Sequence, residues 1–366
     1  MAKGTQPSKI IIKTGPMASF LFVCMLLCMG LFGCTERPVD GKLNANLNNS
    51  KPKQLVYGGA TMGTTYQVKI ASRNTAVPKS LSEQINKRLE FLDNTFTTYQ
   101  NTSELMLFNQ AEIKQPMIIS DDMQRVMKLA REVHGLTRGA FDPTVAPLVN
   151  LWGFGPKYTG DEIPEPEEIN QYLSSMGLSH LSLDQNAKTA SRTTDIQLDF
   201  SAIVKGYAVD VVAELLIASG IENYLVEVGG ELRASGRKHN GDFWRIAIEK
   251  PSLSQGGIQQ VVDLENVAVA TSGDYRNYFE KNGKRYSHTI DPRTGYPVDH
   301  KLASVTVIAA TAARADALAT AMMVMGPEQT LLFAEQHSIP AYILVKQSEG
   351  FEVQYSQAFH DYLSGE

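Results

Sequence analysis

The stretch LDFSAIVKGYAVD at residues 198–210 changes from an extended segment into a helix, which we expect to cover residues 202–219 and to end at Gly220. Before it, the spacing of apolar residues predicts strands over 55–70, with a turn at Met62-Gly63, and helices over 79–95 and 121–134. After it, strands are expected over 223–228, 231–236, 244–250, 258–264, 284–290, 303–310, 341–346 and 351–355, with helices over 313–325 and 328–337. Runs of strands followed by helices favour an α+β fold with antiparallel sheets over a doubly wound parallel sheet.

The composition excludes several classes of protein. The chain has 366 residues, of which 43% are hydrophobic and 20% charged, so it can fill a core. The net charge is −5 and no block of like charges is present, which argues against a nucleic-acid-binding tail. Three cysteines are too few for a dense disulfide framework.

The N-terminus has the pattern of a secretory signal. Lys3, Lys9 and Lys13 precede the apolar run 18–33, which is shorter than the ~20 residues of a membrane span. The run ends at Cys34 and resembles a bacterial lipobox, so we predict a lipoprotein signal peptide over 1–33 and lipidation of Cys34. The alternative is an uncleaved signal anchor; either way the body lies outside the cytoplasm.

The polar residues that follow predict a tether. Residues 34–54 would form the lipid anchor and a flexible linker rich in Asn, Pro and Gly. The folded domain is expected over residues 55–360, beginning near Leu55.

Motifs of the common enzyme classes are absent from the sequence. No glycine-rich dinucleotide fingerprint or phosphate-loop lysine motif follows a strand, and there is no nucleophile elbow, HExxH or zinc-ligand spacing. Ordinary dehydrogenases, serine hydrolases and zinc proteases are therefore disfavoured.

Lys205 suggests a phosphate partner. It lies on the first helical turn after Asp199 and Ser201, where a cation is mildly unfavourable beside the helix dipole. A bound anion would explain such a lysine. A solvated lysine on a capped helix is the alternative.

The segment TSGDYRNYFEKNGKRYSHTIDPRTGYPV at 271–298 is dense in reactive groups. Asn282-Gly283 predicts a hairpin turn, and Asp-Pro-Arg-Thr-Gly predicts a second tight turn. Together the two turns would bring His288 and Asp291 to one strand end. His288 is therefore a candidate catalytic residue.

The helical segment ADALATAMMVMG at 315–326 carries polar groups on an apolar background. Asp316 and Thr320 are four residues apart and share one helix face. A carboxylate beside a hydroxyl suits a hard cation such as Mg²⁺. Alternatively, Thr320 bonds its own helix backbone and Asp316 is an early-turn acid.

Two further segments carry unusual glycines or aromatics. GAFDPTVAPLVNLWGFGP at 139–156 overlaps a Pro- and Gly-rich region, 142–165, that we expect to be mostly loop. Its aromatics could line a flat-ring pocket, or the segment is a covering loop pinned by Trp152. Gly229 and Gly230 interrupt a strand pattern, as expected where a ligand or another backbone comes close, or at a bulge.

Together these segments resemble the ApbE family of bacterial FAD:protein FMN transferases, over about residues 57–345. The motifs occur in the family's order: TMGTTY, SEL, GAFDPT, DFSAIVKGYAVD, GGE, TSGDY, HTIDPRTGYP and DALAT. The resemblance implies an α+β fold related to the T-fold, with FAD in a cleft between two lobes.

The resemblance also implies the reaction. A Thr or Ser hydroxyl of an acceptor protein would attack the FMN-side phosphorus of FAD with Mg²⁺ present, and AMP would leave. Implied acceptors are subunits of sodium-pumping NADH:quinone reductase and related electron-transport complexes outside the cytoplasm. The enzyme would be held on the periplasmic side of a bacterial membrane, with the inner membrane favoured.

The resemblance assigns roles to individual positions. Mg²⁺ would be held by the Ala202 carbonyl, Asp316 and Thr320, and His288 would act in catalysis. Independently of the resemblance, a threonine hydroxyl needs a base or a metal to take its proton; His288 is the first choice of base, and Asp291 would orient it or replace it. Glu231 stands where many members carry Asp or Asn. The residues implied to contact FAD are Met62, Tyr99, Ala140, Phe141, Asp142, Asp199, Lys205 and Ile290.

Two other functions stay open from the sequence. A Mg²⁺-dependent FAD pyrophosphatase would use the same site with water as the nucleophile. A lipid-anchored flavin- or solute-binding protein would bind without turnover.

Overall fold

The computed structural model describes residues 53–72, 76–156, 160, 162–251, 257–274 and 277–363. They belong to one compact unit, residues 50–366. The predicted signal peptide over 1–33, Cys34 and nearly all of the predicted tether over 34–54 lie outside the described residues. Within the described part, no helix is both long and apolar enough to cross a membrane.

One eight-stranded sheet organises the fold, and all its neighbouring strands are antiparallel. This confirms the α+β class with antiparallel sheets. In spatial order the strands are β1 (Lys53–Thr61), β2 (Thr64–Ser72), β6 (Tyr224–Val228), β7 (Glu231–Ser235), β10 (Val267–Gly273), β13 (Leu302–Ala309), β14 (Ala341–Lys346) and β15 (Phe351–Tyr355).

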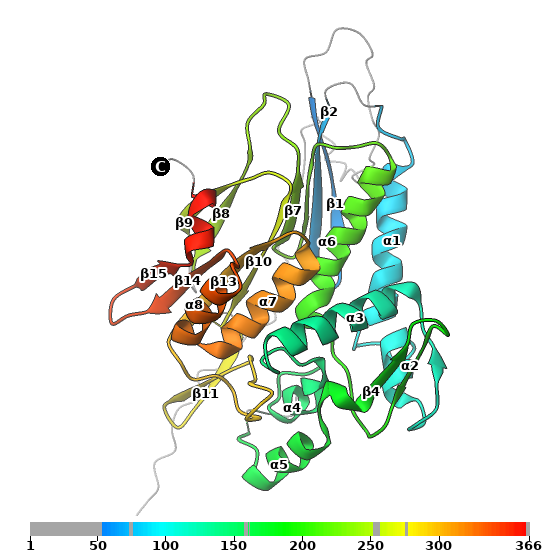
Figure 1. Cartoon of the computed structure of the whole chain (residues 1–366), viewed down its shortest axis with the longest axis vertical. Coiled ribbons are helices and arrows are strands. Elements are labelled where there is room, and N and C mark those ends of the chain that lie inside the picture. The colour runs from blue at the N-terminus through cyan, green and yellow to red at the C-terminus, as the bar shows by residue number, and fades with distance from the viewer. Residues whose placement is uncertain are drawn as a thin grey trace, which may run out of the picture. The chain divides into compact units, whose positions relative to one another are not determined.

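Helices cover one face of this sheet (Figure 1). Side chains alternate along a strand, so Val226 and Val228 of β6 face the helices while Leu225 faces the opposite side. The helices of this layer are α1 (Leu81–Phe96), α3 (Asp121–Leu136), α6 (Ser201–Ala218), α7 (Ala312–Met325) and α8 (Pro327–Gln336).

The other face carries a second apolar cluster. Leu225 and Val269 of the sheet pack with Trp244, Val262 and Phe359. These come from the hairpin β8 (Trp244–Lys250) and β9 (Gly257–Leu264) and from the short helix η3 (Gln357–Tyr362). Because both faces are covered, the inner strands β6, β13 and β14 are buried on both sides, whereas the edge strands β1 and β15 are partly exposed.

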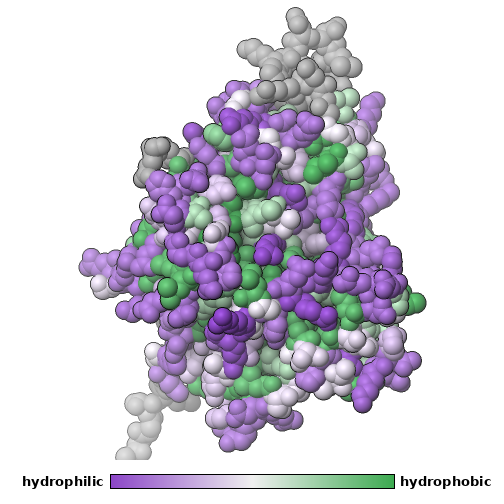
Figure 2. All heavy atoms as spheres, in the orientation of Figure 1, coloured by the Kyte–Doolittle hydropathy of each residue, from purple (hydrophilic) through white to green (hydrophobic). Residues whose placement is uncertain are grey.

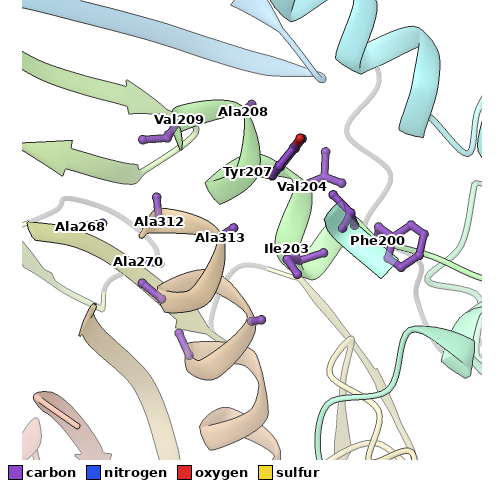
Figure 3. Close-up of a cluster of buried hydrophobic side chains, with 14 of the residues drawn as sticks. Phe200, Ile203, Val204, Tyr207, Ala208, Val209, Ala268, Ala270, Ala312 and Ala313 are labelled. Carbon is purple, nitrogen blue, oxygen red and sulfur yellow. The ribbon is translucent and has the colours of Figure 1, made fainter. Parts of the chain in front are cut away.

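Helices α6 and α7 touch at Gly206. A Cβ atom built there would lie 2.3 Å from the Ala312 carbonyl oxygen, so any larger residue would force the helices apart. Figure 3 shows Ala312 and Ala313, at the start of α7, beside the α6 stretch that carries Ile203 and Tyr207. On the molecular face seen in Figure 2, polar side chains predominate and apolar ones show between them.

A third apolar cluster lies around Trp152. It joins the hairpin β11 (Tyr278–Lys281) and β12 (Lys284–Ser287) to α4 (Ala146–Leu151) and α5 (Pro166–Ser175). Trp152, Tyr286, Phe279 and Phe154 stack in series, with ring centroids 5.6, 5.0 and 5.5 Å apart. This stack attaches the hairpin to the segment that directly follows α4.

Several expectations from the sequence need correction. Most described residues of the region 142–165 lie outside helices and strands, as expected, but the sequence did not predict the short 3₁₀ turn (Pro143–Val145) and α4, which form where apolar side chains pack on Trp152. The strand expected over 284–290 ends at Ser287, where the chain turns away toward a bridge between Ile290 and Pro297.

Other elements escaped prediction. Strand β10 lies in the middle of the sheet and is buried on both faces, so its sequence lacks alternation between polar and apolar residues. The remaining elements that were not expected are α2 (Glu104–Gln110), β3 (Met117–Ile118), α5, η2 (Leu178–His180), β4 (Leu181–Asp184), β5 (Thr189–Arg192), β11 and η3.

Candidate active site

A cavity of about 440 Å³ gathers most of the expected site residues. Its walls come from the start of α6, the loop after α3, the end of β10, the residues after β12, and α7. The expected residues that line it are Tyr99, Ala140, Phe141, Asp142, Asp199, Ala202, Lys205, His288, Ile290, Asp316 and Thr320.

A second hollow, of about 670 Å³, shares Tyr99, Asp199 and Lys205 with the first. Met62 lines this second hollow. It occupies the β1–β2 turn with Gly63, and both residues have positive φ, 48° and 69°. The two-residue hairpin predicted at Met62-Gly63 is therefore present, and it presents the Met62 side chain near the site.

The contact of α6 with α7 positions the charged groups. The amide of Gly206 donates to Asp316 Oδ2 at 3.1 Å. Buried Asp210, also on α6, accepts from the amides of Ala312 and Ala313 at 3.0 and 2.9 Å and so caps the N-terminus of α7. Lys205 and Asp316 are thus fixed relative to each other by the two helices that carry them.

Three ionisable side chains meet at this point. Lys205 Nζ lies 3.1 Å from Glu231 Oε1 and 3.8 Å from Asp316 Oδ2. Burial and the charge of Asp316 raise the pKa of Glu231 to about 8, and burial also raises the pKa of Asp316. Burial alone would lower the pKa of Lys205, but the charges of Asp316 and Glu231 outweigh it and raise that pKa. One ammonium group is therefore shared by two carboxyl groups, and Glu231 keeps its proton to a higher pH than an ordinary glutamate.

The expected metal ligands form a set of hard oxygen donors. Thr320 Oγ1 lies 3.2 Å from Ser272 Oγ, and its helix neighbour Asp316 is buried in the same wall. The Ala202 carbonyl belongs to the first turn of α6, and Glu231 Oε2 is buried without a hydrogen-bond partner in the part of the chain described. A carboxylate, a hydroxyl and a carbonyl with an unused buried oxygen nearby fit a Mg²⁺ ion. No group of three or more His, Cys, Asp or Glu side chains that could hold a metal occurs among the described residues.

His288 has a defined tautomer. Its Nδ1 lies 2.9 Å from the Asn277 carbonyl oxygen, which can only accept, so Nδ1 carries the proton. Burial lowers the pKa of His288 below its usual value. The neutral ring therefore leaves Nε2 as a proton acceptor on a residue that lines the cavity.

Asp291 is engaged elsewhere. Its carboxylate forms a two-point ion pair with Arg293, at 2.9 and 2.8 Å, and its carbonyl accepts from the amide of Gly295 in the expected turn. Among the described contacts none joins Asp291 to His288. Asp291 lines neither hollow, although its neighbour Pro292 lines the first cavity. Both predicted turns are present, but they bring only His288 to the cavity.

The loop after α3 is held by its own hydrogen bonds. Asp142 Oδ1 accepts from the amide and the hydroxyl of Thr144, at 2.8 and 2.7 Å. His134 Nδ1 donates to the Phe141 carbonyl at 3.0 Å, and Thr137 Oγ1 accepts from the Phe141 amide at 3.2 Å. This network fixes Ala140 and Phe141 against the cavity before any ligand binds.

Several cavity residues were not among the expected ones. Glu231 follows the Gly229-Gly230 turn, which was noted only as a place of close backbone approach. Ser272 and Phe154 also line the cavity, and both lie in segments that the sequence marked as chemically dense or aromatic. Met323 also lines the cavity, and the sequence gives no signal for this because Met323 has the pattern of an ordinary buried helix residue.

Known proteins are similar to this chain over most of its length. The model of the ApbE family matches residues 62–343. A protein named FAD:protein FMN transferase, from Vibrio cholerae, is 45% identical over 316 residues, covering 86% of this chain and 94% of the relative. The flavin transferase ApbE structure from Vibrio cholerae superposes with a TM-score of 0.78 at 43% identity, covering 85% of this chain and all of that one. The apo structure of the flavinyl transferase from Pseudomonas stutzeri gives 0.80 at 40% identity, with 87% and 100% covered.

Proposed function

This chain belongs to the ApbE family and transfers FMN from FAD to an acceptor protein, and we propose that the cavity around Lys205, Asp316 and His288 performs the transfer and releases AMP. The observation that carries this proposal is the meeting of these three side chains, from α6, α7 and the end of β12, in one cavity. Cation, metal-binding carboxylate and base are the groups that phosphoryl transfer requires.

Lys205 is assigned to the pyrophosphate of FAD. Its pKa is raised by Asp316 and Glu231, so the ammonium stays charged across the physiological range. The side chain is partly exposed, at 31%, and can therefore reach a ligand in the cavity. A fixed cation stabilises the negative charge that spreads over the phosphoryl oxygens in the transition state.

Asp316, Thr320 and the Ala202 carbonyl would hold Mg²⁺. When bound, this ion neutralises charge on the pyrophosphate. Asp316 is held for that role by the Gly206 amide, and Thr320 by Ser272.

His288 is assigned as the base. The hydroxyl of an acceptor Thr or Ser gives its proton to His288 Nε2 as its oxygen bonds to the FMN-side phosphorus. The bond from that phosphorus to the bridging oxygen breaks, and the electron pair leaves with AMP. The Asn277 carbonyl holds Nδ1–H and steadies the imidazolium that forms. Asp291 is occupied by Arg293, which favours His288 over Asp291 as the base.

Location and partners are proposed on the sequence. The N-terminal pattern supports a lipid-anchored protein on the periplasmic side, with the inner membrane favoured. Subunits of sodium-pumping NADH:quinone reductase or related complexes are the proposed acceptors.

The test uses purified protein with FAD, Mg²⁺ and an acceptor domain that carries a target threonine. We expect a fluorescent flavin band on the denatured acceptor and one AMP released for each FMN transferred. Both products should be lost when a chelator removes Mg²⁺. AMP and free FMN without a band would indicate the pyrophosphatase. Bound FAD with no AMP at all would overturn the catalytic assignment and leave a flavin-binding protein.

A further inference from the structure

His288 belongs to a small hairpin and not to the main sheet. Strands β11 and β12 form a separate two-stranded sheet, and His288 directly follows β12. The groups it must work with, Lys205 and Asp316, are carried by helices packed on the main sheet. Some contact between hairpin and sheet therefore has to set the position of the imidazole.

Arg285 makes that contact. It lies on β12, three residues before His288, and its Nη2 donates to the carbonyl oxygen of Asp274. Its guanidinium also lies over the Tyr278 ring of the opposite strand, 3.8 Å from the centroid. One planar side chain thus braces both strands of the hairpin and reaches the end of β10.

Asp274 is itself firmly held. It is 4% exposed, its amide donates to the Ala303 carbonyl at 3.1 Å, and its carboxylate binds Lys346 Nζ at 2.7 Å. Ala303 lies on β13 and Lys346 on β14, so Asp274 is anchored to two strands of the main sheet. The Arg285 contact therefore ends on a rigid point.

The same end of β10 also reaches α7. Ser272, two residues before Asp274, lies 3.2 Å from Thr320 through their hydroxyl oxygens. The end of β10 therefore contacts both the hairpin that carries His288, through Asp274, and the proposed metal-binding face of α7, through Ser272. On its other side, His288 meets the Phe154 ring edge-on, at 6.4 Å between centroids.

We propose that Arg285 is a positioning residue for the transfer reaction, holding the His288 hairpin against the Asp274 end of β10 so that Nε2 faces the reacting hydroxyl. Arg285 lines neither hollow and so acts through His288 without touching substrate. This inference rests on the proposed role of His288 as the base. A displacement of about 1 Å at a reacting group is enough to lower a rate about 100-fold.

The decisive variant is Arg285→Met, which keeps the apolar stem and removes the guanidinium. We expect kcat for FMN transfer to fall about 100-fold, with KM for FAD unchanged because no FAD-facing group is lost. Arg285→Lys should recover only part of kcat, since an ammonium can bond one carbonyl but cannot brace the Tyr278 ring in the same plane. Arg245→Met is the matched control, because Arg245 is an exposed arginine of another hairpin, paired with Asp263; it should leave both constants unchanged.

A second readout is independent of activity. In protein with ¹⁵N-labelled histidine rings, the His288 signal is assigned by its loss in His288→Gln. Because the Asn277 carbonyl that binds Nδ1–H directly precedes β11 of the same hairpin, the Nδ1–H tautomer should persist in all three proteins. The ring signal should keep its position in Arg245→Met and should broaden and shift in Arg285→Met, as the imidazole moves relative to the main sheet. An unchanged ring signal with unchanged kcat would overturn the proposal, and so would an equal loss of FAD affinity and kcat, which indicates general damage to the fold. If the parent itself forms no flavin band, the proposed function fails, while the comparison of ring signals still decides whether Arg285 positions His288.

Discussion

Gly206 of α6 lies against Ala312 of α7 so closely that a Cβ atom would sit 2.3 Å from the Ala312 carbonyl oxygen. This contact sets the spacing of the two helices that carry Lys205 and Asp316. Their side chains, 3.8 Å apart, depend on it because each is only a few residues from the crossing point. A glycine that looks like a helix weakness in the sequence is thus required by the site.

Gly206→Ala should therefore destabilise the protein by about 1–3 kcal/mol or more through overpacking. Its control is Gly135→Ala in α3, where the added Cβ meets nothing within 4 Å. That change should stabilise by up to about 1 kcal/mol, because alanine favours the helix. Urea denaturation of both variants measures the difference, and equal stability of the two would contradict the tight crossing.

Glu231→Gln should change stability in a pH-dependent way. The pKa of Glu231 is raised by burial to about 8, so the folded state holds its proton while the unfolded chain ionises near pH 4.5. The contribution of this group to the free energy of unfolding is therefore lost as pH rises from about 4.5 toward 8. Above about pH 8 the buried, ionised carboxylate destabilises the folded state most. The variant should therefore gain Tm relative to the parent at about pH 9 and show little difference at about pH 5.

Thermal melts of the metal-free protein at the two pH values provide the measurement. Glu227→Gln serves as a control, because Glu227 lies in the adjacent strand outside the cavity. A Tm difference independent of pH would contradict the assignment.

In the pH profile of kcat/KM, the loss of activity on the acid side should have its midpoint below pH 6.5. A base works only when neutral, and burial lowers the pKa of His288, so the neutral form persists into more acidic solution than for a free histidine. Release of AMP measured against pH, with acceptor protein in excess, checks this. His288→Gln should remove most activity at every pH, whereas a limb at or above 6.5 would contradict a buried base.

Thr320→Val should raise the Mg²⁺ concentration needed for half-maximal activity. The change removes a hydroxyl donor but keeps the shape of the side chain, and hard cations bind weakly with one oxygen fewer. Thr306→Val is the control, since the Thr306 hydroxyl pairs with Thr271 at 2.8 Å and is no proposed ligand. Activity is measured against Mg²⁺ concentration for both variants. Equal Mg²⁺ concentrations at half-maximal activity would show that Thr320 is not a ligand.

Local signals predicted much of the fold. The turn at Asn282-Gly283 follows from two residues that tolerate positive φ, and at Met62-Gly63 the glycine supplies that tolerance while Met62 also adopts a positive φ; both turns are present. Helix α3 begins after Ser120, whose hydroxyl accepts from the Met123 amide as a cap should. Strand β10 and the short helix α4 were missed because packing stabilises them more than their own residue preferences do.

The sequence by itself determined where most helices and hairpins begin and end, which motifs carry chemistry, and the family. Such features depend on backbone preferences of neighbouring residues and on short patterns. Tertiary structure alone decided that Glu231 shares Lys205 with Asp316, that Asp291 turns to Arg293, and that Arg285 ties the His288 hairpin to β10. These pairings join residues far apart in the chain or choose between nearby partners, and they are set by which side chains packing brings into the same low-dielectric space.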